Sequence, residues 1–525
     1  MERHDFDLSI YLVTNAEMVP ESNTFIEQVK AAIDNGVTCV QLREKNVSTR
    51  AFIERALEVK KLTDAARIPL IINDRVDVAL AVDAHLHIGQ DDMTVPMARK
   101  LLGPNKIIGV STGYVDEVEK AIDDGADYIG IGIIFDTNTK KTSKIAMGPV
   151  GCQELLKVIQ RRDSKMKTCV IGGIKPDNVQ RVRYMSSIPA TKDQRGVSID
   201  GAAVVSCIMA EKDAGAATRL LVKKWKSKPD FIDEENRPHD EKFRMEPYLT
   251  ALKDSQIMVH HITNDVVKNF SANVTLAIGA SPLMSECQDE FLELAANDGT
   301  ALLLNTGTPN DEQTEMYVAG LNAYNKYKRP IVYDPVAAGA SSIRRQSVKK
   351  ILLEGYVSVI KGNAGEIYAA AGRSNKMRGV DSGIGESYTE QIEVAKELAA
   401  RTKAVVVLTG KVDIIVDGRS PYDYTYGTHQ MRVATVAGGH KMMSQITGTG
   451  CSLGSTIASF IAPAPATHRD TFLQTVAACC LYKKAGERAA ALFDGKPGSF
   501  QTHFLDELSC CLRESDSCTP NFMYE

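Results

Sequence analysis

Residues 39–72 read CVQLREKNVSTRAFIERALEVKKLTDAARIPLII. Two apolar runs, residues 39–42 and 70–72, flank an amphipathic stretch at residues 49–66 that is typical of a helix. A strand, a helix and a second strand in succession form the repeating unit of a parallel sheet, because parallel neighbours need a long crossover connection. The stretch therefore predicts a βαβ unit and an α/β fold.

Similar apolar runs recur at short intervals through the first part of the chain. They lie at residues 8–13, 39–42, 70–72, 86–88, 107–110, 128–135, 169–174 and 202–205, and amphipathic stretches separate most of them. Eight strand-and-helix units in about 230 residues fit a closed (β/α)8 barrel. We therefore expect residues 1–230 to form a TIM barrel.

A charge-dense stretch with two prolines follows the last of these apolar runs. Residues 223–230 read KKWKSKPD and residues 234–242 read EENRPHDEK, with little to bury. This composition predicts a linker, which we place at residues 231–245.

Residues 246–525 show a different pattern. Apolar runs at residues 301–304, 331–333, 357–360 and 405–408 alternate with helical patterns, and the Ala-, Gly- and Ser-rich tail from Thr447 reads mainly as helix. This order predicts an open, doubly wound α/β sheet. The two halves share no obvious repeat, so we expect two different enzymes in one chain.

Composition narrows the class of protein. The chain has 525 residues and a formal net charge of -4, and this near-neutral balance argues against a nucleic-acid-binding protein. Its 11 cysteines are odd in number and include no Cys-x-x-Cys pair, which is against a disulfide framework or a zinc site. The N-terminus has no signal-peptide pattern, and no apolar run approaches the ~18 residues of a membrane span. We expect a cytoplasmic protein whose partners are small molecules, not nucleic acid or membranes.

Polar residues follow the second, third and fourth apolar runs of the expected barrel, where such barrels place their chemistry. Gln41, Arg43 and Lys45 alternate along the chain, so in a strand they point to one side. Two cations and an amide together favour an anionic ligand. Asp74 and Asp92 follow the next two runs, and hard carboxylates on neighbouring strands suit a Mg²⁺ ion that bridges to phosphate. The combination predicts a diphosphate site.

The last four runs also end in polar or small residues. Ser111 follows the fifth run, Thr137 follows the sixth, Gly173 lies at the end of the seventh, and Ser206 follows the eighth. The loops after strands seven and eight are the usual phosphate site of these barrels, so a second phosphate is expected there. Taken singly, pairs such as Asn73-Asp74 are common turns, but their recurrence at successive strand ends favours a site.

The strings QLREK (41–45), ND (73–74), HIGQDD (87–92), GVST (109–112), TNTK (137–140) and IGGI (171–174), in this order, resemble the thiamine-phosphate synthase family. The likeness spans residues 8–222. Such enzymes join an aminopyrimidine methyl diphosphate to a thiazole phosphate. Asp136 departs from the proline that the family usually has there, and residues 186–196 read as an inserted loop before the last strand.

This resemblance implies a role for each matching residue. It assigns Mg²⁺ to Asp74 and Asp92. It places the pyrimidine diphosphate at Gln41, Arg43, Lys45, Asn73, Ser111 and Lys140, with Ser111 beside the reacting carbon. It places the thiazole phosphate at Thr137, Thr139, Gly173, Val205 and Ser206.

The strongest local feature of the second half is GGHKMMSQITGTGC, residues 438–451, which precedes a helical pattern of small residues. Glycines that open a helix leave N–H groups unpaired, and the helix dipole favours negative charge there. The motif therefore predicts an anion hole for a transferring phosphoryl group. Cys451 is a candidate base for an acceptor hydroxyl, and a buried, inert cysteine at a packed helix start is the alternative.

Two further strings follow predicted strands. DPVAAGASSIR, residues 334–344, offers a carboxylate and Arg344, which suits triphosphate oxygens. KGNAGE, residues 361–366, offers Glu366 as a Mg²⁺ ligand, directly or through water. Each string is also typical of an ordinary turn.

Together with HHITNDVVKNFSAN (260–273) and GASPLM (279–284), these strings resemble the hydroxyethylthiazole kinase family over residues 246–515. The resemblance implies a ribokinase-like fold, with Met284 and Gly448 at the thiazole alcohol, Arg344 and Thr409 at ATP, and Cys451 beside the phosphoryl acceptor. Related kinases are trimers, so a homo-oligomer built on a kinase trimer is expected.

The two resemblances are consistent with each other, because the second half would make the thiazole phosphate that the first half consumes. They predict a bifunctional thiamine biosynthesis enzyme that uses Mg²⁺ in both halves and ATP in the kinase. One alternative is a phosphosugar-isomerase-like barrel fused to a sugar kinase, although the aspartate of sugar kinases is absent from TGTGC at residues 447–451. Another is a thiamine-pathway sensor with one non-catalytic half.

Overall fold

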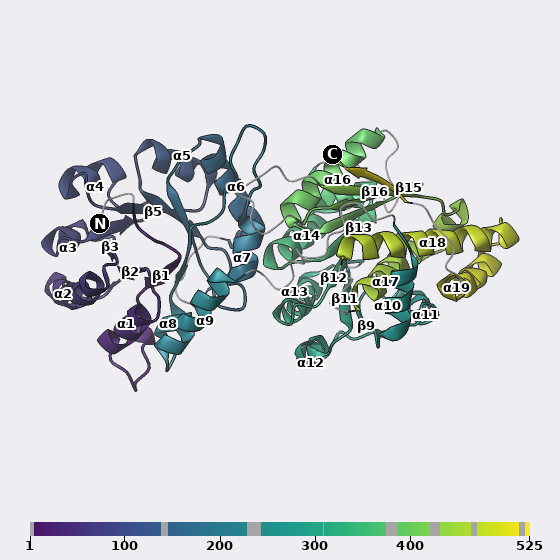
Figure 1. Ribbon diagram of the computed structural model, residues 1–525, viewed down its shortest axis with the longest axis horizontal. Coiled ribbons are helices and arrows are strands. Elements are labelled where there is room, and N and C mark those ends of the chain that lie inside the picture. The colour runs from purple at the N-terminus through teal and green to yellow at the C-terminus, as the bar shows by residue number, and fades with distance from the viewer. Residues whose placement is uncertain are drawn as a thin grey trace. The chain divides into compact units, whose positions relative to one another are not determined.

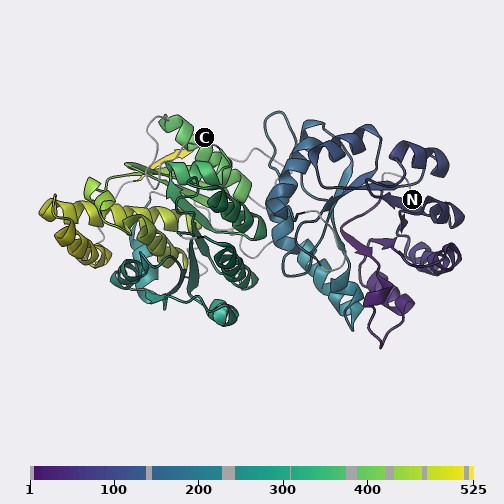
Figure 2. The same cartoon turned by 180° about the vertical axis from the view of Figure 1, so that it is seen from behind.

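The computed structural model describes residues 5–137, 145–227, 243–307, 309–373, 387–419, 431–463, 470–513 and 520–524. These residues form two compact units, one up to residue 227 and one from residue 243 onward (Figures 1 and 2). Residues 231–242 of the predicted linker lie outside the described residues. In the described part of the chain, no helix is both long enough and apolar enough to cross a membrane.

In the first unit, eight parallel strands close into a barrel in chain order. They are β1 (Ile10–Val13), β2 (Cys39–Leu42), β3 (Leu70–Asn73), β4 (His85–Ile88), β5 (Ile108–Thr112), β6 (Tyr128–Gly132), β7 (Lys167–Ile171) and β8 (Gly201–Val204). Tyr11 of β1 pairs with Cys39 on one side and with Ala203 on the other, which closes the ring. The predicted TIM barrel is confirmed.

Alternation along the strands divides the barrel residues between interior and exterior. The helices lie outside the strands (Figure 1): α1 (Phe25–Asp34), α2 (Thr49–Ala66), α3 (Val76–Ala81), α4 (Val95–Leu102), α5 (Val115–Asp123), α6 (Gly148–Arg161), α7 (Val179–Ser186), α8 (Ser206–Met209) and α9 (Ala214–Lys226). Ile10 and Leu12 of β1 join the core that includes buried helix residues, whereas Tyr11 and Val13 join the cluster inside the ring. The period of two places alternate residues on opposite faces.

The second unit contains a nine-stranded sheet within its described residues, in the order β10-β9-β11-β12-β13-β14-β15-β16-β17. The strands are β9 (Met258–Ile262), β10 (Ser281–Leu283), β11 (Thr300–Asn305), β12 (Ile331–Asp334), β13 (Val359–Asn363), β14 (Val405–Thr409), β15 (Val412–Asp417), β16 (Arg432–Ala437) and β17 (Asn521–Tyr524). The four predicted apolar runs correspond to β11 to β14. The sheet is parallel from β10 to β14, and β15 to β17 extend it as antiparallel strands.

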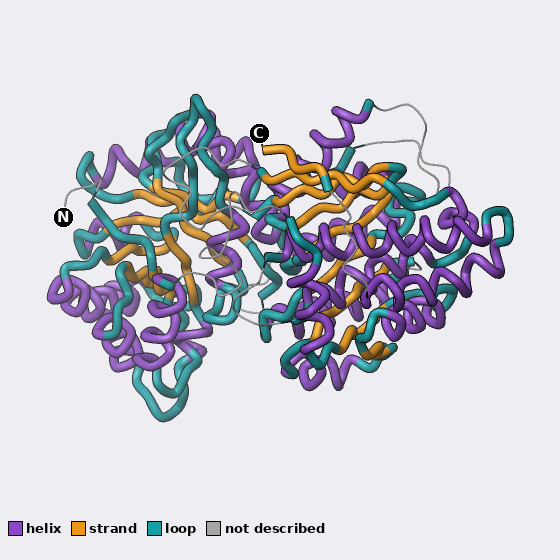
Figure 3. The backbone as a smooth tube through the Cα atoms, turned by 45° about the vertical axis from the view of Figure 1, so that its right-hand side comes forward, coloured by secondary structure: helices purple, strands orange, loops and turns teal. Residues whose placement is uncertain are grey.

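Helices cover both faces of this sheet (Figure 3). One face packs against α10 (Glu246–Asp254), α11 (Lys268–Ala277), α17 (Thr449–Ile461), α18 (Thr471–Phe493) and α19 (Pro497–Arg513). The other packs against α12 (Phe291–Ala296), α13 (Asp311–Lys326), α14 (Ser342–Glu354), α15 (Ala364–Ala370) and α16 (Tyr388–Thr402). Leu303 of β11 belongs to the first core, and its neighbours Leu302 and Leu304 belong to the second. The expected doubly wound fold is confirmed.

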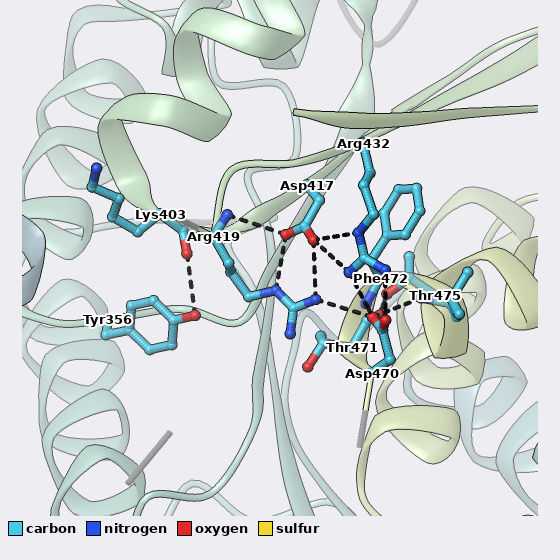
Figure 4. A network of polar contacts seen from close by, with 10 residues as sticks. Tyr356, Lys403, Asp417, Arg419, Arg432, Asp470, Thr471, Phe472 and Thr475 are labelled. Atoms are coloured by element: carbon cyan, nitrogen blue, oxygen red, sulfur yellow. Dashed lines mark hydrogen bonds and ion pairs between the residues drawn. The ribbon is translucent and has the colours of Figure 1, made fainter. Parts of the chain in front are cut away.

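Two arginines and two aspartates form a buried ionic cluster that joins β15, β16 and α18 (Figure 4). Arg419 Nε lies 2.9 Å from Asp417 Oδ1, and Arg432 Nη2 lies 2.6 Å from Asp417 Oδ2. Arg432 Nη1 lies 2.6 Å from Asp470 Oδ2, while Asp470 Oδ1 accepts a 3.0 Å hydrogen bond from the backbone N–H of Phe472 at the start of α18. The cluster therefore fixes the antiparallel strands against the longest helix of this face.

Asp470→Asn is expected to destabilise the second unit by about 3 kcal/mol, because asparagine keeps the capping oxygen but leaves two buried arginines with one carboxylate. Burial alone would raise the pKa of Asp470, but the ion pairs with Arg432 and Arg419 hold this pKa below its ordinary value. A lowered folded-state pKa means that the stabilisation is present above pH ~4 and is lost as the pH falls further.

Urea unfolding at pH 7 and pH 3 measures this prediction. The difference between wild type and Asp470→Asn should shrink at pH 3, where the wild-type carboxylate takes up a proton. Asp494→Asn makes the same change at a side chain that is 53% exposed and serves as the control. Equal unfolding midpoints of wild type and Asp470→Asn at pH 7 would contradict the prediction.

Candidate active sites

The structure brings Asp74 and Asp92 together at the carboxyl end of the barrel. Asp74 follows β3 with a left-handed φ of 62°, its carboxyl group shares a hydrogen bond with that of Asp92, and it forms an ion pair with Lys45. Asp92 Oδ2 also accepts a 2.7 Å hydrogen bond from the backbone N–H of Gly89. These contacts arise from three successive strand ends, as the sequence predicts.

The electrostatics of this carboxyl pair fit a divalent cation. Burial would raise the pKa of Asp74, but Lys45 and Asp92 hold this pKa below its ordinary value. The pKa of Asp92 is raised, by burial and by the neighbouring Asp74 charge. Two carboxyl groups that share a proton form a site where Mg²⁺ can replace that proton and keep its other positions for water and phosphate. Among the described residues, no group of three or more His, Cys, Asp or Glu side chains is arranged to hold a metal ion.

A buried chain of hydrogen bonds crosses the barrel interior from Gln41 to Ser111. Gln41 Nε2 donates to Tyr11 Oη at 2.7 Å, and Tyr11 Oη and Tyr128 Oη share a hydrogen bond of 2.7 Å. His87 Nδ1 lies 2.9 Å from Tyr128 Oη, and His87 Nε2 lies 2.9 Å from Ser111 Oγ. The sequence identified the two ends of this chain but not its three central members.

Burial explains the state of the central members of this chain. It raises the pKa values of Tyr11 and Tyr128 well above their ordinary range, so both phenols stay neutral. Gly109 of β5 makes room for one ring, because a Cβ there would lie 2.0 Å from Tyr128 Cζ. The alternation of inward and outward residues in β1, β4 and β6 is the signal that identifies these side chains as inward-pointing.

Three other predicted diphosphate residues lie at or just after the ends of strands β2 and β3. Strand β2 ends at Leu42, so Arg43 and Lys45 stand in the following loop, and the expectation that they alternate within the strand was wrong. The Arg43 backbone N–H donates to Thr14 Oγ1 at 3.1 Å, and Asn73, the last residue of β3, is buried.

The predicted thiazole phosphate residues follow β6, β7 and β8. Gly173 has a φ of 65°, and a Cβ there would lie 2.7 Å from Phe135 Cβ, so glycine permits the loop after β6 to approach. Val205 directly follows β8 and caps α8, and Ser206 is the first residue of that helix. Because β7 and β8 pair directly, the segments that follow them start side by side.

Two stretches of the barrel sequence carry further predictions: the TNTK string at residues 137–140 and the inserted loop at residues 186–196. Thr137 is described and half-buried, but Thr139 and Lys140 lie outside the described residues. The predicted inserted loop at residues 186–196 is closed by an antiparallel bridge between Ile188 and Val197.

In the second unit, Asp334 at the end of β12 is the centre of a buried polar cluster. Lys361 Nζ of β13 lies 2.9 Å from Asp334 Oδ2, and Asn305 Nδ2 of β11 donates to the same oxygen at 3.1 Å. Within the described residues, Asp334 Oδ1 is buried with no hydrogen-bond partner. Cys451, in the first turn of α17, lies close enough for the Asp334 charge to raise its pKa. The sequence identified Cys451 but assigned no role to Lys361 or Asn305.

The thiol of Cys451 keeps its proton in this environment. Burial first, and then the charge of Asp334, raise the pKa of Cys451 to about 12. A thiol with this pKa is almost entirely neutral at pH 7 and is a poor general base. The geometry therefore favours Cys451 as a neutral thiol beside the Asp334 and Lys361 pair.

Glu366, the predicted Mg²⁺ ligand, and Arg344, a predicted ATP residue, bind backbone groups of the loops around this cluster. Glu366 Oε1 accepts a 2.9 Å hydrogen bond from the Ala337 N–H, and Oε2 accepts a 2.8 Å bond from the Asn363 N–H. Burial and the Asp334 charge raise the pKa of Glu366 to about 6. Arg344 donates to three backbone carbonyl groups, among them the Gly307 carbonyl at 2.7 Å. Both side chains hold the loops after β11, β12 and β13 in place.

The glycine-rich segment forms the predicted helix start. Gly438, Gly439 and Gly448 have φ values of 112°, 77° and 96°, and Gly448 caps α17, which begins at Thr449. A short 3-10 helix at Lys441–Gln445, which the sequence did not predict, separates the two glycine bends.

Strand order places Met284, a predicted thiazole residue, and Thr409, a predicted ATP residue, on opposite sides of this cluster. Met284 follows β10 at one edge, Thr409 ends β14, and Asp334 ends β12 between them. All six strands from β10 to β14 are parallel, so their carboxyl ends meet at one edge of the sheet. The sheet can thus hold an acceptor and a donor on either side of Asp334 and Cys451.

Sequence comparisons match each unit to a known family. Residues 10–208 match the model described as thiamine monophosphate synthase, and residues 249–514 match the hydroxyethylthiazole kinase family. The thiamine biosynthetic bifunctional enzyme of Saccharomyces cerevisiae is 41% identical over 524 residues, which cover 96% of this chain and 96% of that protein. A hydroxyethylthiazole kinase of Thermoanaerobacter sp. is 44% identical over 261 residues, which cover 50% of this chain and 92% of that protein. A thiamine-phosphate synthase of Clostridium botulinum is 44% identical over 221 residues, which cover 42% of this chain and 94% of that protein.

A closed barrel with paired carboxyl groups, followed by a doubly wound sheet with a glycine-rich helix start, defines a fused enzyme with two phosphate-handling sites. The chain belongs to the family of bifunctional thiamine biosynthetic enzymes, with a thiamine-phosphate synthase domain followed by a hydroxyethylthiazole kinase domain. This confirms the resemblances seen in the sequence and favours them over a sugar-kinase fusion.

Proposed function

We propose that the kinase domain transfers the γ-phosphoryl group of ATP to the hydroxyl group of 4-methyl-5-(2-hydroxyethyl)thiazole. The synthase domain then joins the thiazole phosphate to 4-amino-2-methyl-5-(diphosphooxymethyl)pyrimidine, giving thiamine phosphate and pyrophosphate. The observation that carries this proposal is that each domain has carboxyl groups and a cation near the carboxyl ends of parallel strands: Asp74, Asp92 and Lys45 in the barrel, and Asp334, Glu366 and Lys361 in the sheet.

In the synthase reaction the bond between the methylene carbon and the diphosphate oxygen breaks, and its electron pair leaves with pyrophosphate. The thiazole nitrogen then donates its lone pair to the methylene carbon, so no general base is needed. Mg²⁺ at Asp74 and Asp92, when bound, supplies positive charge to the departing diphosphate. Arg43 and Lys45 add cationic charge at the same strand end.

The buried chain that ends at Ser111 has a separate role in this proposal. Gln41 and Ser111 are its two ends, and an aminopyrimidine ring presents both donors and acceptors to such groups. Hydrogen bonds through His87 fix the orientation of the Ser111 hydroxyl. The chain would therefore hold the pyrimidine with its methylene carbon facing the thiazole.

In the kinase reaction the hydroxyl oxygen forms a bond to the γ-phosphorus as the bond between that phosphorus and the ADP oxygen breaks, and the hydroxyl proton passes to an oxygen of the transferred phosphoryl group and then to solvent. Lys361, which pairs with Asp334, would supply positive charge to the transferring group, and the N–H groups at the start of α17 would provide further donors. The unpaired Asp334 oxygen and the nearby Glu366 carboxylate are a donor set that fits Mg²⁺, which would neutralise charge on the triphosphate. Cys451 would touch the acceptor hydroxyl as a neutral thiol.

Cys451→Ser is therefore expected to retain most of the kinase activity, whereas Cys451→Ala should lower kcat about tenfold through the loss of one hydrogen-bonding group. Serine keeps a small neutral hydrogen-bond donor at this position. A serine hydroxyl could not replace a thiolate that acts as a base. Steady-state kinetics of thiazole phosphorylation from pH 6 to pH 10 measure both variants. A loss in Cys451→Ser of 1,000-fold or more would indicate a thiolate base and contradict the neutral-thiol assignment.

The whole function is tested by mass-spectrometric detection of thiamine phosphate. Purified protein is incubated with hydroxyethylthiazole, ATP, Mg²⁺ and the pyrimidine diphosphate, and each component is omitted in turn. Product that requires all four supports both activities. No product, even when thiazole phosphate is supplied, would overturn the synthase proposal, and product only with supplied thiazole phosphate would overturn the kinase proposal.

We also propose that the protein is a cytoplasmic homo-oligomer assembled through its kinase domain. Val266 and Leu276, which lie just before and on α11, are 73% and 59% exposed, and we take them as the candidate contact residues of this assembly. Analytical ultracentrifugation of wild type and of a Val266→Glu, Leu276→Glu variant tests the assembly. A wild-type monomer would overturn the proposed assembly. Imaging of the tagged protein in cells tests the proposed cytoplasmic location.

A further inference from the structure

Lys483 of α18 connects two loops of the kinase domain. The first loop ends at Lys411 and the second begins at Gly438, 27 residues later in the chain. Its side chain is almost fully buried, with 6% of the residue exposed. Its Nζ donates to backbone carbonyl groups of Gly410 at 3.0 Å, Lys411 at 3.2 Å and Gly438 at 3.4 Å. It also lies 3.1 Å from Asp413 Oδ1.

These contacts join the segment that directly follows Thr409, a predicted ATP residue, to the start of the predicted glycine-rich anion hole. Gly410 and Lys411 form the turn between β14 and β15, directly after Thr409. Gly438 directly follows β16 and begins the glycine-rich segment that leads to Cys451. Val412 of β15 pairs with Ala437 of β16, so both segments lie at the same edge of the sheet.

A second side chain on the same face of α18 holds the glycine bend. Glu487, four residues after Lys483, accepts a 3.2 Å hydrogen bond from the Gly439 N–H at Oε1. Gly438 has a φ of 112°, and a Cβ there would lie 2.4 Å from Glu487 Oε1. Lys483 therefore binds the Gly438 carbonyl and Glu487 binds the Gly439 N–H, so two side chains of α18 together fix the position of the bend.

The ammonium group of Lys483 has more oxygen neighbours than it has N–H bonds to donate. An ammonium group has three N–H bonds, and here it faces four oxygen atoms, three of them backbone carbonyls of the two loops. Asp413 Oδ1 of β15 in turn accepts a 3.0 Å hydrogen bond from the Gly410 N–H, so the carboxylate also holds the first loop. Charge-assisted hydrogen bonds of this kind fix geometry more strongly than neutral ones.

We propose that Lys483 is a positioning residue that sets the spacing between the Thr409–Lys411 turn and the Gly438–Gly439 bend, and that this spacing determines the affinity of the kinase for its nucleoside triphosphate. The inference rests on the proposed function, in which Thr409 binds ATP. Thiazole binding at Met284, on the far side of β12, is independent of this spacing.

Lys483→Met tests this proposal, because methionine has a similar length but neither charge nor donors. The KM for ATP is expected to rise about tenfold, whereas kcat and the KM for hydroxyethylthiazole stay within about twofold of wild type. Lys484→Met, the neighbouring lysine of the same helix, is the matched control and should leave all three constants unchanged. Synthase activity with supplied thiazole phosphate checks that the rest of the chain is intact.

A double variant separates positioning from the burial of an unpaired charge. Asp413→Asn combined with Lys483→Met removes both charges but keeps an oxygen that accepts from the Gly410 N–H. The double variant should recover thermal stability while the KM for ATP stays high. Recovery of the wild-type KM for ATP would overturn the proposal, as would a Lys483→Met variant in which both KM values rise together or neither changes. A wild-type protein that does not use ATP would instead refute the proposed function.

Discussion

Asp92→Asn is expected to lower thiamine phosphate formation about 100-fold or more while thiazole phosphorylation stays at the wild-type rate. Asparagine has the shape of aspartate and can still accept the hydrogen bond from the Gly89 N–H, so the loop after β4 is preserved. It cannot supply the second negative charge beside Asp74 that the proposed Mg²⁺ ion would need. The loss should therefore appear in the synthase reaction alone.

Asp91→Asn is the matched control for this variant, because it makes the same change one residue earlier in the same loop. Synthase rates are measured with supplied thiazole phosphate over a Mg²⁺ titration, and kinase rates are measured on the same samples. Higher Mg²⁺ should restore part of the activity of Asp92→Asn if the carboxylate binds the cation. Equal losses of both activities would contradict the assignment of Asp92 to the barrel site.

The pH dependence of the synthase follows from the same pair. Burial and the Asp74 charge raise the pKa of Asp92, so its proton is held to a higher pH than in an ordinary carboxyl group. Protonation removes the charge that attracts Mg²⁺, so the apparent Mg²⁺ affinity of wild type should fall as the pH drops through this raised pKa. Asp92→Asn should lack this acid limb.

Strand and helix positions could be predicted from the sequence where apolar runs are long and buried. The barrel strands and β11 to β14 are such runs, because strands covered on both faces carry apolar residues at successive positions. Strands β15 and β16 contain charged residues such as Asp417 and Arg432, which pair with each other inside the domain. A charged residue whose burial depends on a partner far away in the chain looks like a surface residue in the sequence.

The same reason explains which site residues the sequence identified. Asp74 stands directly after β3, Asp92 lies in the loop after β4, and Cys451 lies in the first turn of α17, so local sequence places them. His87 and Tyr128 lie within strands and look like core residues until the barrel closes and β4 and β6 direct them to one interior. Lys483 lies in the middle of α18, and its four oxygen partners come from segments 45 to 73 residues away. Only the fold brings such groups together.

Lys361→Met is expected to lower kinase turnover about 100- to 1,000-fold, while the synthase reaction with supplied thiazole phosphate is unchanged. Lys361 is 3% exposed, and its Nζ lies 2.9 Å from Asp334 Oδ2. Burial would lower the pKa of this lysine, but the charges of Asp334 and Glu366 raise it, so the group is cationic at the pH of the reaction. Methionine fills the same volume without supplying charge to the transferring phosphoryl group.

Loss of turnover must be separated from loss of folding, because Lys361→Met leaves the buried Asp334 without its cation. The double variant Asp334→Asn, Lys361→Met removes both charges and should recover thermal stability but not activity. Lys403→Met is the matched control. Lys403 is a second lysine of this domain that is 1% exposed, and burial lowers its pKa to about 7, so it is easily neutralised. It lies before β14, at the opposite end of that strand from Thr409, and its replacement should leave kinase turnover unchanged. A stable double variant with wild-type turnover would show that the cation at position 361 serves the fold and not the transfer.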